Sequence, residues 1–575
     1  MVEALHSFVK ITDLKDMLNK SGELYGDEPA YKFKTDKENE FKIITHKQVR
    51  EDINCLGTAL LNMNLKDKKI AVISENRYEW GVAYLAICTG VGIVVPLDKS
   101  LPDNEIENLI IRSEVEAIFY SNKYDQVMNN IKQKNNSKLK YYISMDLEEN
   151  NQYVLSLSSL IKQGEDFISN NDTSFINAKI DSEKVSFVLF TSGTTSLSKA
   201  VMLSHKNICT NLMDIASVIE LTPDDTLLSF LPLHHTFECT VGFLYPMYIG
   251  CSIAFCDGIR HIADNIREYK ITAMISVPIL YENMFKKLIK AIEKKGKLNT
   301  VKRGIKISNF FLKLGIDIRK KLFKEIHETL GGKVRLFVSG GAALDVETEI
   351  GFNELGFKIV SGYGLTETSP VIAAGNDRYT KIGSIGRVFP SLEVEIVNAN
   401  EQGIGELIVK GPSIMLGYYN NEEETNKVLK NGWLYTGDLG YFDKDNFLYI
   451  TGRKKNVIVL KNGKNIYPEE IEALINKIDI IKESFVYGKL DKDDDMRICA
   501  KIVYDKNTIQ ELYNISEQDE ILQIIWKDIK EINKTMPPYK YIREIDITQD
   551  ELIKTTTQKI KRHEELAKIL GRNSI

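Results

Sequence analysis

Short apolar runs alternate with amphipathic stretches of helical period through most of the first 450 residues. Each run spans five or six residues between polar segments, as strands covered on both faces do. Five examples are 69–74, 116–120, 185–190, 271–276 and 334–338. Because strands alternate with helices, the pattern favours an α/β fold with mostly parallel sheets.

The pattern changes at about residue 383, where shorter strands and glycine turns begin. This pattern of short strands and glycine turns predicts a small β-rich subdomain over about 383–452. After Gly452 a basic, polar stretch precedes a new α+β pattern, so we place a domain boundary there. The 575 residues exceed the roughly 250–300 at which a single core stops growing. We therefore expect a large domain at 1–452 and a C-terminal domain at 453–575.

One segment, 81–97, is apolar enough to suggest a membrane span. It is shorter than the roughly 20 residues that a spanning helix needs, and glycines and Pro96 interrupt it. The segment instead predicts a helix, a turn and a buried strand. The first residues lack the apolar core of a secretory signal, so we expect a cytoplasmic protein.

Composition narrows the class of protein. Hydrophobic residues make up 43% and charged residues 27%, which is typical of globular enzymes. The formal net charge of -5 argues against nucleic acid as the main partner. The seven cysteines form no CxxC pair, and they predict small buried side chains in a reducing compartment.

The segment 286–324 is strongly basic, with fourteen Lys and Arg residues against two acids, Glu293 and Asp317. It predicts one or two basic helices. One interpretation is a solvated helical face. The other is attraction to an anionic membrane surface or to a polyanionic substrate.

A loop rich in hydroxyls follows the apolar run 185–190 and ends at Lys199. Backbone N–H groups, hydroxyl donors and a fixed positive charge suit a polyphosphate. The loop is not a Walker loop, because Ser198 precedes the lysine and Ala200 follows it. An ordinary Ser/Thr-rich surface turn is the alternative. The candidate phosphate ligands are Thr191, Ser192, Gly193, Thr194, Thr195 and Lys199.

Two further segments suit a nucleotide. Gly340, Gly341 and Ala342 follow a strand, so the backbone can approach a flat ligand closely. In the stretch 361–370, Tyr363 could stack on a base and Glu367 could hold Mg²⁺ between phosphates. A charge at the start of a helix is the simpler interpretation of Glu367.

The last candidate residues lie in the final third of the chain. Asp438 follows a tight turn and could accept hydrogen bonds from two ribose hydroxyls. Arg453 belongs to a second cationic cluster. Lys559 lies in a hydroxyl-rich segment near the C-terminus. Taken singly, Asp438 could be a turn residue and Lys559 a solvated tail residue.

These segments together resemble the adenylate-forming superfamily of acyl-CoA synthetases, luciferases and peptide-synthetase adenylation domains. The resemblance runs from about residue 25 to 565, and LPLHHTFE, GYGLTETSP and GRKKNVIV look most like long-chain fatty acyl-CoA synthetases. The other matching motifs are FTSGTTSLSKA, SGGAAL, GELIVKG, GWLYTGDLGYF and KTTTQKIKR.

The resemblance implies a two-step reaction. A fatty carboxylate attacks the α-phosphate of ATP, with Mg²⁺, to give acyl-AMP and pyrophosphate, and the thiol of coenzyme A then displaces AMP. It also implies an N-terminal ATP- and acyl-binding adenylation domain followed by a mobile C-terminal domain. That domain would turn about Lys455 and exchange Lys559 for the 456–467 loop between the half-reactions.

Residue roles also follow from the resemblance. Lys559 would bridge the carboxylate and the α-phosphate, and Thr366 would contact the α-phosphate. Glu367 would bind Mg²⁺, and His235 would line the acyl or thiol entrance with Phe237 and Glu238. A hydrogen-bonded core histidine is the alternative interpretation of His235. The residues around adenine would be Gly340, Gly341, Ala342, Gly362, Tyr363 and Gly364, and the ribose would contact Asp438 and Arg453.

The chain departs from the family pattern in two motifs. Ser196, Ser198 and Ala200 stand where the phosphate loop usually has glycine, proline and glycine. A serine at a glycine position of positive φ costs about 1 kcal/mol, so nucleotide affinity is the property we expect to change. In the last motif, Gln558 replaces glycine and Ile553 replaces proline.

The sequence leaves the acceptor of the acyl group open. Free coenzyme A and the thiol of a separate acyl carrier protein are both compatible with it. A catalytically weak nucleotide-binding homologue and a light-emitting oxygenase of the same fold are further alternatives. The acyl pocket is expected to be apolar, with Phe237, Phe243, Leu244 and 277–281 among its walls.

Overall fold

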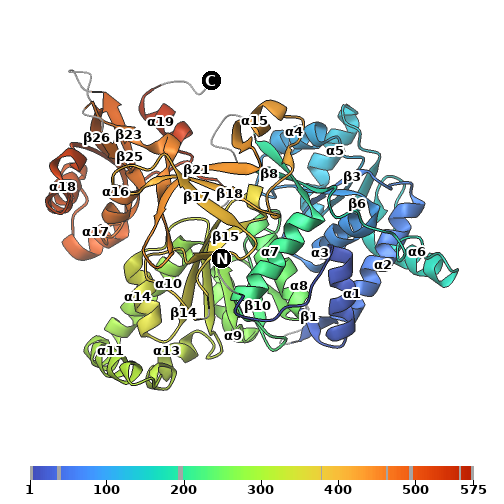
Figure 1. Cartoon of the computed structure of the whole chain (residues 1–575), viewed down its shortest axis with the longest axis horizontal. Coiled ribbons are helices and arrows are strands. Elements are labelled where there is room, and N and C mark those ends of the chain that lie inside the picture. The colour runs from blue at the N-terminus through green and yellow to red at the C-terminus, as the bar shows by residue number, and fades with distance from the viewer. Residues whose placement is uncertain are drawn as a thin grey trace. The chain divides into compact units, whose positions relative to one another are not determined.

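The computed structural model describes residues 4–34, 40–191, 198–376, 378–461, 464–490, 496–555 and 559–571 (Figure 1). The chain divides into two compact units. Unit 1 comprises 1–191, 199–393 and 409–434, and unit 2 comprises 192–198, 394–408 and 435–575.

An eight-stranded sheet in unit 1 contains the strands predicted at 69–74, 116–120 and 185–190. Its inner strands are parallel, and β9 and β19 are antiparallel additions at one edge. In spatial order the strands are β19 (Gly417–Tyr418), β9 (Lys199–Ser204), β8 (Val185–Thr191), β4 (Ile93–Pro96), β3 (Lys69–Ile73), β5 (Ala117–Tyr120), β6 (Tyr141–Ser144) and β7 (Leu155–Ser156).

Both faces of this sheet are covered, which explains its unbroken apolar runs. On β8, Val188 packs in a core cluster with residues of α4 (Asp103–Ser113) and α5 (Asp125–Lys134). The preceding residue, Phe187, points the other way and stacks on Tyr84 of α3 (Tyr78–Ala86), with ring centroids 5.9 Å apart.

A nine-stranded sheet in unit 1 contains the strands predicted at 271–276 and 334–338. Its middle strands are parallel, and the strands at both edges are antiparallel. The order is β16 (Arg387–Val388), β15 (Val371–Ala374), β14 (Lys358–Gly364), β13 (Leu336–Gly340), β12 (Ala273–Ser276), β10 (Thr226–Ser229), β11 (Ser252–Phe255), β1 (Pro29–Lys34) and β2 (Phe41–Thr45).

Helices of unit 1 bury apolar side chains against these sheets. One core cluster joins Met274 and Phe337 of the nine-stranded sheet to Tyr281 of α10 and Phe352 of α14. Further helices are α1 (Leu14–Leu24), α2 (His46–Asn62), α6 (Leu157–Ser169), α7 (His205–Val218), α8 (Tyr245–Ile249), α9 (Ile262–Glu268), α10 (Pro278–Lys294), α14 (Val346–Glu354) and α15 (Glu422–Val428).

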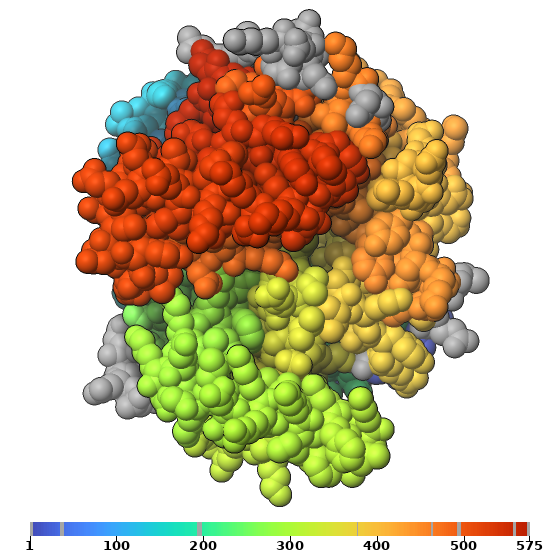
Figure 2. All heavy atoms as spheres, turned by 90° about the vertical axis from the view of Figure 1, so that its left-hand side faces the viewer, coloured from blue at the N-terminus to red at the C-terminus, as the bar shows by residue number. Residues whose placement is uncertain are grey.

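The basic segment 286–324 is helical, as predicted, but it extends over more than the one or two helices expected. It runs through α10, α11 (Leu298–Lys313) and α12 (Arg319–Leu322) to the first residue of α13 (Lys324–Thr329). These helices are the light green surface at the bottom of Figure 2. Several apolar side chains among the lysines are more than half exposed, including Ile307, Phe310 and Leu314.

The apolar segment 81–97 forms the predicted helix, turn and strand. Helix α3 continues into a π-helical turn at Ile87–Val91, and β4 follows. Among the helices that the described residues form, none combines the length and apolar character needed to cross a bilayer.

Unit 2 is built around two antiparallel strands, β25 (Ile481–Leu490) and β26 (Met496–Tyr504), with β27 (Glu544–Thr548) parallel to β26. A core of isoleucines packs this sheet against α16 (Pro468–Ile475) and α18 (Gln518–Lys534). Two more helices are α17 (Lys506–Tyr513) and α19 (Arg562–Ile569). The fold is the predicted α/β class with a separate C-terminal part.

Unit 2 also contains most of the β-rich region. Strand β22 (Leu448–Arg453) pairs with β21 (Trp433–Phe442), and β23 (Ile458–Val459) pairs with β24 (Asn465–Ile466). Strands β17 (Glu393–Val397) and β18 (Gly405–Lys410) belong to the same region. The boundary between 452 and 453 and the extent of the subdomain stay predictions.

Candidate active site

The glycines predicted to surround adenine lie at the ends of two neighbouring strands. Strands β13 and β14 are parallel, and Gly340 lies opposite Gly362. A Cβ on Gly340 would come within 2.7 Å of the Phe237 ring, so a side chain does not fit there. Gly341 has a φ of +87°, which favours glycine. The close approach at Gly340 is to the Phe237 ring, and the approach of these glycines to adenine stays a prediction.

The residues after β14 form a tight turn that presents Thr366 and Glu367. They lie in a 3-10 turn at Thr366–Thr368, and the Leu365 N–H donates to the Pro370 carbonyl at 3.0 Å. The Thr236 hydroxyl donates to the Thr366 hydroxyl at 3.2 Å. This bond joins the turn to the segment that carries His235.

Tyr418 links Glu367 to Lys199. The Tyr418 hydroxyl donates to Glu367 Oε1 at 2.8 Å, and the Lys199 ammonium lies 4.9 Å from the centroid of the Tyr418 ring. Burial, followed by the nearby Glu367 carboxylate, raises the pKa of Tyr418 well above its usual range. The phenol therefore stays a hydrogen-bond donor to Glu367 across the physiological range of pH.

Lys199 is paired with an acid in this structure. Its Nζ lies 2.5 Å from Glu424 Oε2, on α15. The hydrogen bonds from Lys199 and then Lys427 lower the pKa of Glu424 to about 2. The carboxylate oxygen occupies a position beside Lys199 that a phosphate oxygen could also take, because both are anionic acceptors.

Sequence reasoning missed Tyr418 and Glu424. The available signals were a pair of tyrosines at 418–419 and the acidic run 422–424 that follows it. What brings Tyr418 to Lys199 is the pairing of β19 with β9, over more than 200 residues of chain. The sequence contains no local indication of that pairing.

The phosphate loop begins and ends on paired strands. Thr191 and Lys199 face each other at the ends of β8 and β9, and the Thr191 hydroxyl donates to the Lys199 carbonyl at 3.3 Å. The predicted ligands Ser192, Gly193, Thr194 and Thr195 lie outside the described residues, and so does Ser196.

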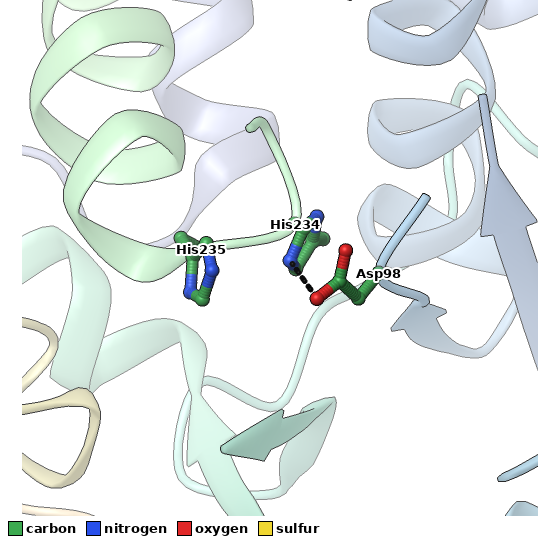
Figure 3. A group of neighbouring side chains, drawn as sticks. All are labelled: Asp98, His234 and His235. Atoms are coloured by element: carbon green, nitrogen blue, oxygen red, sulfur yellow. Dashed lines mark ion pairs between the residues drawn. The ribbon is translucent and has the colours of Figure 1, made fainter. Parts of the chain in front are cut away.

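His235 lies in the turn before a π-helical segment at Phe237–Leu244, next to a buried histidine. The His234 and His235 rings have centroids 4.2 Å apart. His234 Nε2 lies 3.4 Å from Asp98 Oδ2, as Figure 3 shows. The predicted role of His235 at the acyl or thiol entrance stays a prediction.

Glu238, three residues further on, is buried. It is 1% exposed, and its Oε1 accepts a hydrogen bond from the Ser229 hydroxyl at 2.7 Å. Burial raises the pKa of Glu238 to about 8, although the Ser229 bond acts in the opposite direction. Such a shift is common at functional sites and is not restricted to them.

Asp438 and Arg453 form a pair inside unit 2. They face each other across β21 and β22, with 2.9 Å between Arg453 Nε and Asp438 Oδ1. The Asp438 side chain is 5% exposed, and its backbone N–H donates to the Thr436 hydroxyl at 3.1 Å. The proposed hinge residue Lys455 follows in a 3-10 turn at Lys454–Asn456.

Lys559 lies at one end of a small hairpin in unit 2. Lys554 and Ile560 form an antiparallel bridge, and the Thr555 N–H donates to the Lys559 carbonyl at 2.8 Å. The Lys559 N–H donates in return to the Thr555 hydroxyl at 3.1 Å. Gln558 lies outside the described residues.

Comparison with family models identifies the chain. A model described as AMP-binding enzyme matches residues 18–419, which is more than half of the chain. The chain belongs to the AMP-binding enzyme family. A second model, described as the C-terminal domain of AMP-binding enzymes, matches residues 455–568. The superfamily predicted from the motifs is confirmed.

Curated relatives are similar over most of the chain. Fatty acyl-CoA synthetase B of Dictyostelium discoideum is 28% identical, covering 96% of this chain and 89% of its own. Long-chain-fatty-acid–CoA ligase 5 of Rattus norvegicus is 30% identical, covering 78% of this chain and 69% of its own. A chloroplastic long-chain-fatty-acid–[acyl-carrier-protein] ligase of Arabidopsis thaliana is 26% identical, covering 96% of this chain and 85% of its own.

Solved structures share the fold. The anthranilate CoA ligase AuaEII, in complex with anthranoyl-AMP, has a TM-score of 0.76 at 19% identity, covering 97% of both chains. ATP-bound MatB from Rhodopseudomonas palustris has a TM-score of 0.75 at 21% identity, covering 97% of this chain and 99% of its own. At these identities the likeness concerns the fold of this AMP-binding enzyme.

Proposed function

We propose that this AMP-binding enzyme is a long-chain fatty acid–CoA ligase. The observation that carries the proposal is the arrangement of Lys199, Tyr418 and Glu367, which places a cation over the Tyr418 ring and a carboxylate at its hydroxyl. The names of the Dictyostelium and rat relatives support a fatty acyl substrate and coenzyme A as acceptor.

In the first half-reaction, a carboxylate oxygen of the fatty acid attacks the α-phosphorus of ATP. A new phosphorus–oxygen bond forms, and the bond from the α-phosphorus to the oxygen that bridges to the β-phosphate breaks. Both reactants are anions, so positioned cations and hydrogen-bond donors lower the barrier. Lys199 and Lys559 would provide the cations, and Thr366 a hydroxyl donor.

Binding of ATP would require Lys199 to change partners. The lysine is now paired with Glu424, and the β- or γ-phosphate would replace that carboxylate. Because a phosphate has more charge than a carboxylate, the exchange favours the nucleotide. Glu424 would then act as a competing anion that lowers the apparent affinity for ATP.

The residues around Glu367 fit Mg²⁺. Proteins usually bind this ion through one or two carboxylates together with substrate phosphates. The Tyr418 bond to Oε1 fixes the orientation of the Glu367 carboxylate. When bound, the ion would neutralise charge on the departing pyrophosphate, and Glu367 would hold it.

In the second half-reaction, a thiol sulfur attacks the carbonyl carbon of the acyl-AMP, and AMP leaves. Asp438, held by Arg453, would accept the ribose hydroxyls. Rotation at Lys455 would withdraw Lys559 so that the thiol can enter, and such a domain motion can limit turnover.

We also propose a peripheral contact with anionic membranes through α10–α12. Exposed Ile307, Phe310 and Leu314 among lysines combine the apolar and basic character of an interfacial surface. A fatty acid dissolved in the bilayer would then lie close to the enzyme.

Product analysis tests the proposal. Incubation with ATP, Mg²⁺, palmitate and coenzyme A is expected to yield palmitoyl-CoA and AMP in equal amounts, identified by mass spectrometry. Formation of ADP instead of AMP would contradict it. Acyl transfer to an acyl carrier protein but not to coenzyme A would move the assignment to a carrier-protein ligase.

A further inference from the structure

Three side chains with metal-binding atoms meet on one side of the turn at 232–235. Asp98, His234 and His235 each offer one ligand atom, and these atoms all lie within 4.8 Å of one another. Figure 3 shows the two imidazoles, from consecutive residues, beside the carboxylate from a separate segment.

The backbone on both sides fixes the cluster. Asp98 follows β4, and the Ser100 N–H donates to its Oδ1 at 2.8 Å, which turns Oδ2 toward His234. The His235 N–H donates to the Pro232 carbonyl at 3.1 Å, and the His235 carbonyl accepts from the Cys239 N–H at 2.9 Å. The histidines are therefore held between a closed turn and the start of a helix.

The environment of His234 points to a ligand. The residue is 8% exposed, and within the described part of the chain its Nε2 has no hydrogen-bond partner. Its 3.4 Å separation from Asp98 Oδ2 is longer than a usual N–H···O bond. Since a buried polar atom without a partner costs free energy, a bound group at this point would remove that cost.

We propose that Asp98, His234 and His235 bind a transition-metal cation of the zinc class. Two imidazole nitrogens and a carboxylate oxygen are ligands that Zn²⁺ accepts, and a solvent molecule would complete a tetrahedral set. Mg²⁺ is the wrong ion for this cluster, because it prefers oxygen ligands throughout. The cluster is thus chemically distinct from the Mg²⁺ position assigned to Glu367.

The distances suit this geometry after a small adjustment. Metal–ligand bonds of about 2.0–2.1 Å in a tetrahedron place ligand atoms about 3.4 Å apart. The His234–Asp98 pair already has that spacing. The other pairs of ligand atoms lie within 4.8 Å of one another, so small side-chain rotations bring the set to that spacing.

The test uses the full chain after removal of metals with a chelator. Titration with Zn²⁺ is expected to show one tight site per chain, and Co²⁺ in its place is expected to give the intense visible absorption of a tetrahedral centre. His234→Ala and Asp98→Asn are each expected to weaken binding at least about tenfold. His261→Ala, at an exposed histidine of unit 1, is the matched control and is expected to bind as the wild type does.

Unfolding curves recorded without metal check that each variant is folded. Equal affinity for Zn²⁺ in the wild type and in both variants would overturn the inference, as would a weak, octahedral Co²⁺ spectrum. Because the readouts are binding and a spectrum, they do not depend on ligase activity. A failed Zn²⁺ titration would therefore contradict only the metal site, and a failed ligase assay would contradict only the proposed function.

Discussion

Lys501 and Glu565 form a buried ion pair beneath the hairpin that carries Lys559, with 2.7 Å between Nζ and Oε1. The lysine side chain is 9% exposed and the glutamate is fully buried. The second oxygen of Glu565 accepts the Ile553 N–H at 2.9 Å, at the start of the hairpin. The pair therefore ties the hairpin backbone to strand β26.

Glu565→Gln is expected to impair formation of the acyl-adenylate. The substitution leaves the buried Lys501 charge without its counter-ion, and such a loss typically costs about 3–5 kcal/mol of stability. We expect the rate of pyrophosphate release to fall at least about tenfold, since small displacements of a catalytic group cost up to about a hundredfold.

A comparison of the two half-reactions separates positioning from general damage. With preformed acyl-AMP supplied, Glu565→Gln is expected to transfer the acyl group to coenzyme A at the wild-type rate. Glu564→Gln is the matched control, because Glu564 is exposed and pairs only with its neighbour Lys561 among the ion pairs of the described residues. Equal loss in both half-reactions would assign Glu565 a purely structural role.

Glu424→Gln is expected to lower the KM for ATP, because it removes the anion that competes with phosphate for Lys199. The two side chains are 25% and 29% exposed, and ion pairs open to solvent are worth about 0.2–1 kcal/mol, so we expect a change of about two- to fivefold. The folded-state pKa of Glu424 is about 2, so the competition is present above the unfolded value near 4.5 and is lost only toward pH 2.

The effect on KM is therefore expected to be constant between pH 6 and 9. Glu423→Gln is the control, since Glu423 pairs with Lys427 and its side chain is 81% exposed. An unchanged KM in Glu424→Gln would mean that Lys199 does not hold the nucleotide.

Glu238 is expected to make the protein less stable as pH rises. Its folded-state pKa of about 8 lies above the unfolded value near 4.5, so the folded state retains a proton that the unfolded state loses. The stabilisation that the protonated Glu238 gives the folded state is complete below about pH 4.5 and disappears as pH rises through 8. Over this window the loss is on the order of a few kcal/mol.

Urea unfolding of the wild type and Glu238→Gln at several pH values measures this contribution. Glutamine cannot lose a proton, so the variant is expected to show a smaller decrease in stability between pH 5 and 8. Parallel pH profiles for the two proteins would contradict a protonated Glu238.

Phe310→Glu is expected to reduce sedimentation of the protein with vesicles that contain anionic lipid. The Phe310 side chain belongs to α11 and is 61% exposed among lysines. Tyr153→Glu is a matched control, because Tyr153 is similarly exposed, at 65%, outside this surface. Vesicle binding that depends on neither the salt concentration nor the lipid charge would rule out the electrostatic contact.

Local patterns predicted the parts of the fold that depend on neighbouring residues. The apolar run at 185–190 became β8, and the glycines of 340–341 ended β13 next to those of β14, because strand burial and close backbone approach leave direct marks in the sequence. The order of the motifs was enough to predict the family, and the family model confirmed it.

Contacts between distant segments could not be predicted in this way. Tyr418 reaches Lys199 only through strand pairing at a sheet edge, and Asp98 meets His234 across more than 130 residues. A single sequence does not encode such pairings in a local pattern. The roles of the individual site residues, including Lys559 and Lys455, stay predictions for the same reason.

Pyrophosphate release tests the central claim most directly. It would be measured with ATP and Mg²⁺ for saturated acids from acetate to stearate, with and without coenzyme A, for the wild type and Lys559→Ala. We expect release that peaks with a long-chain acid, continues over many turnovers when coenzyme A is present, and collapses in the variant. The proposal would be contradicted if the rate of pyrophosphate release did not depend on the acid supplied, or if Lys559→Ala released pyrophosphate at the wild-type rate.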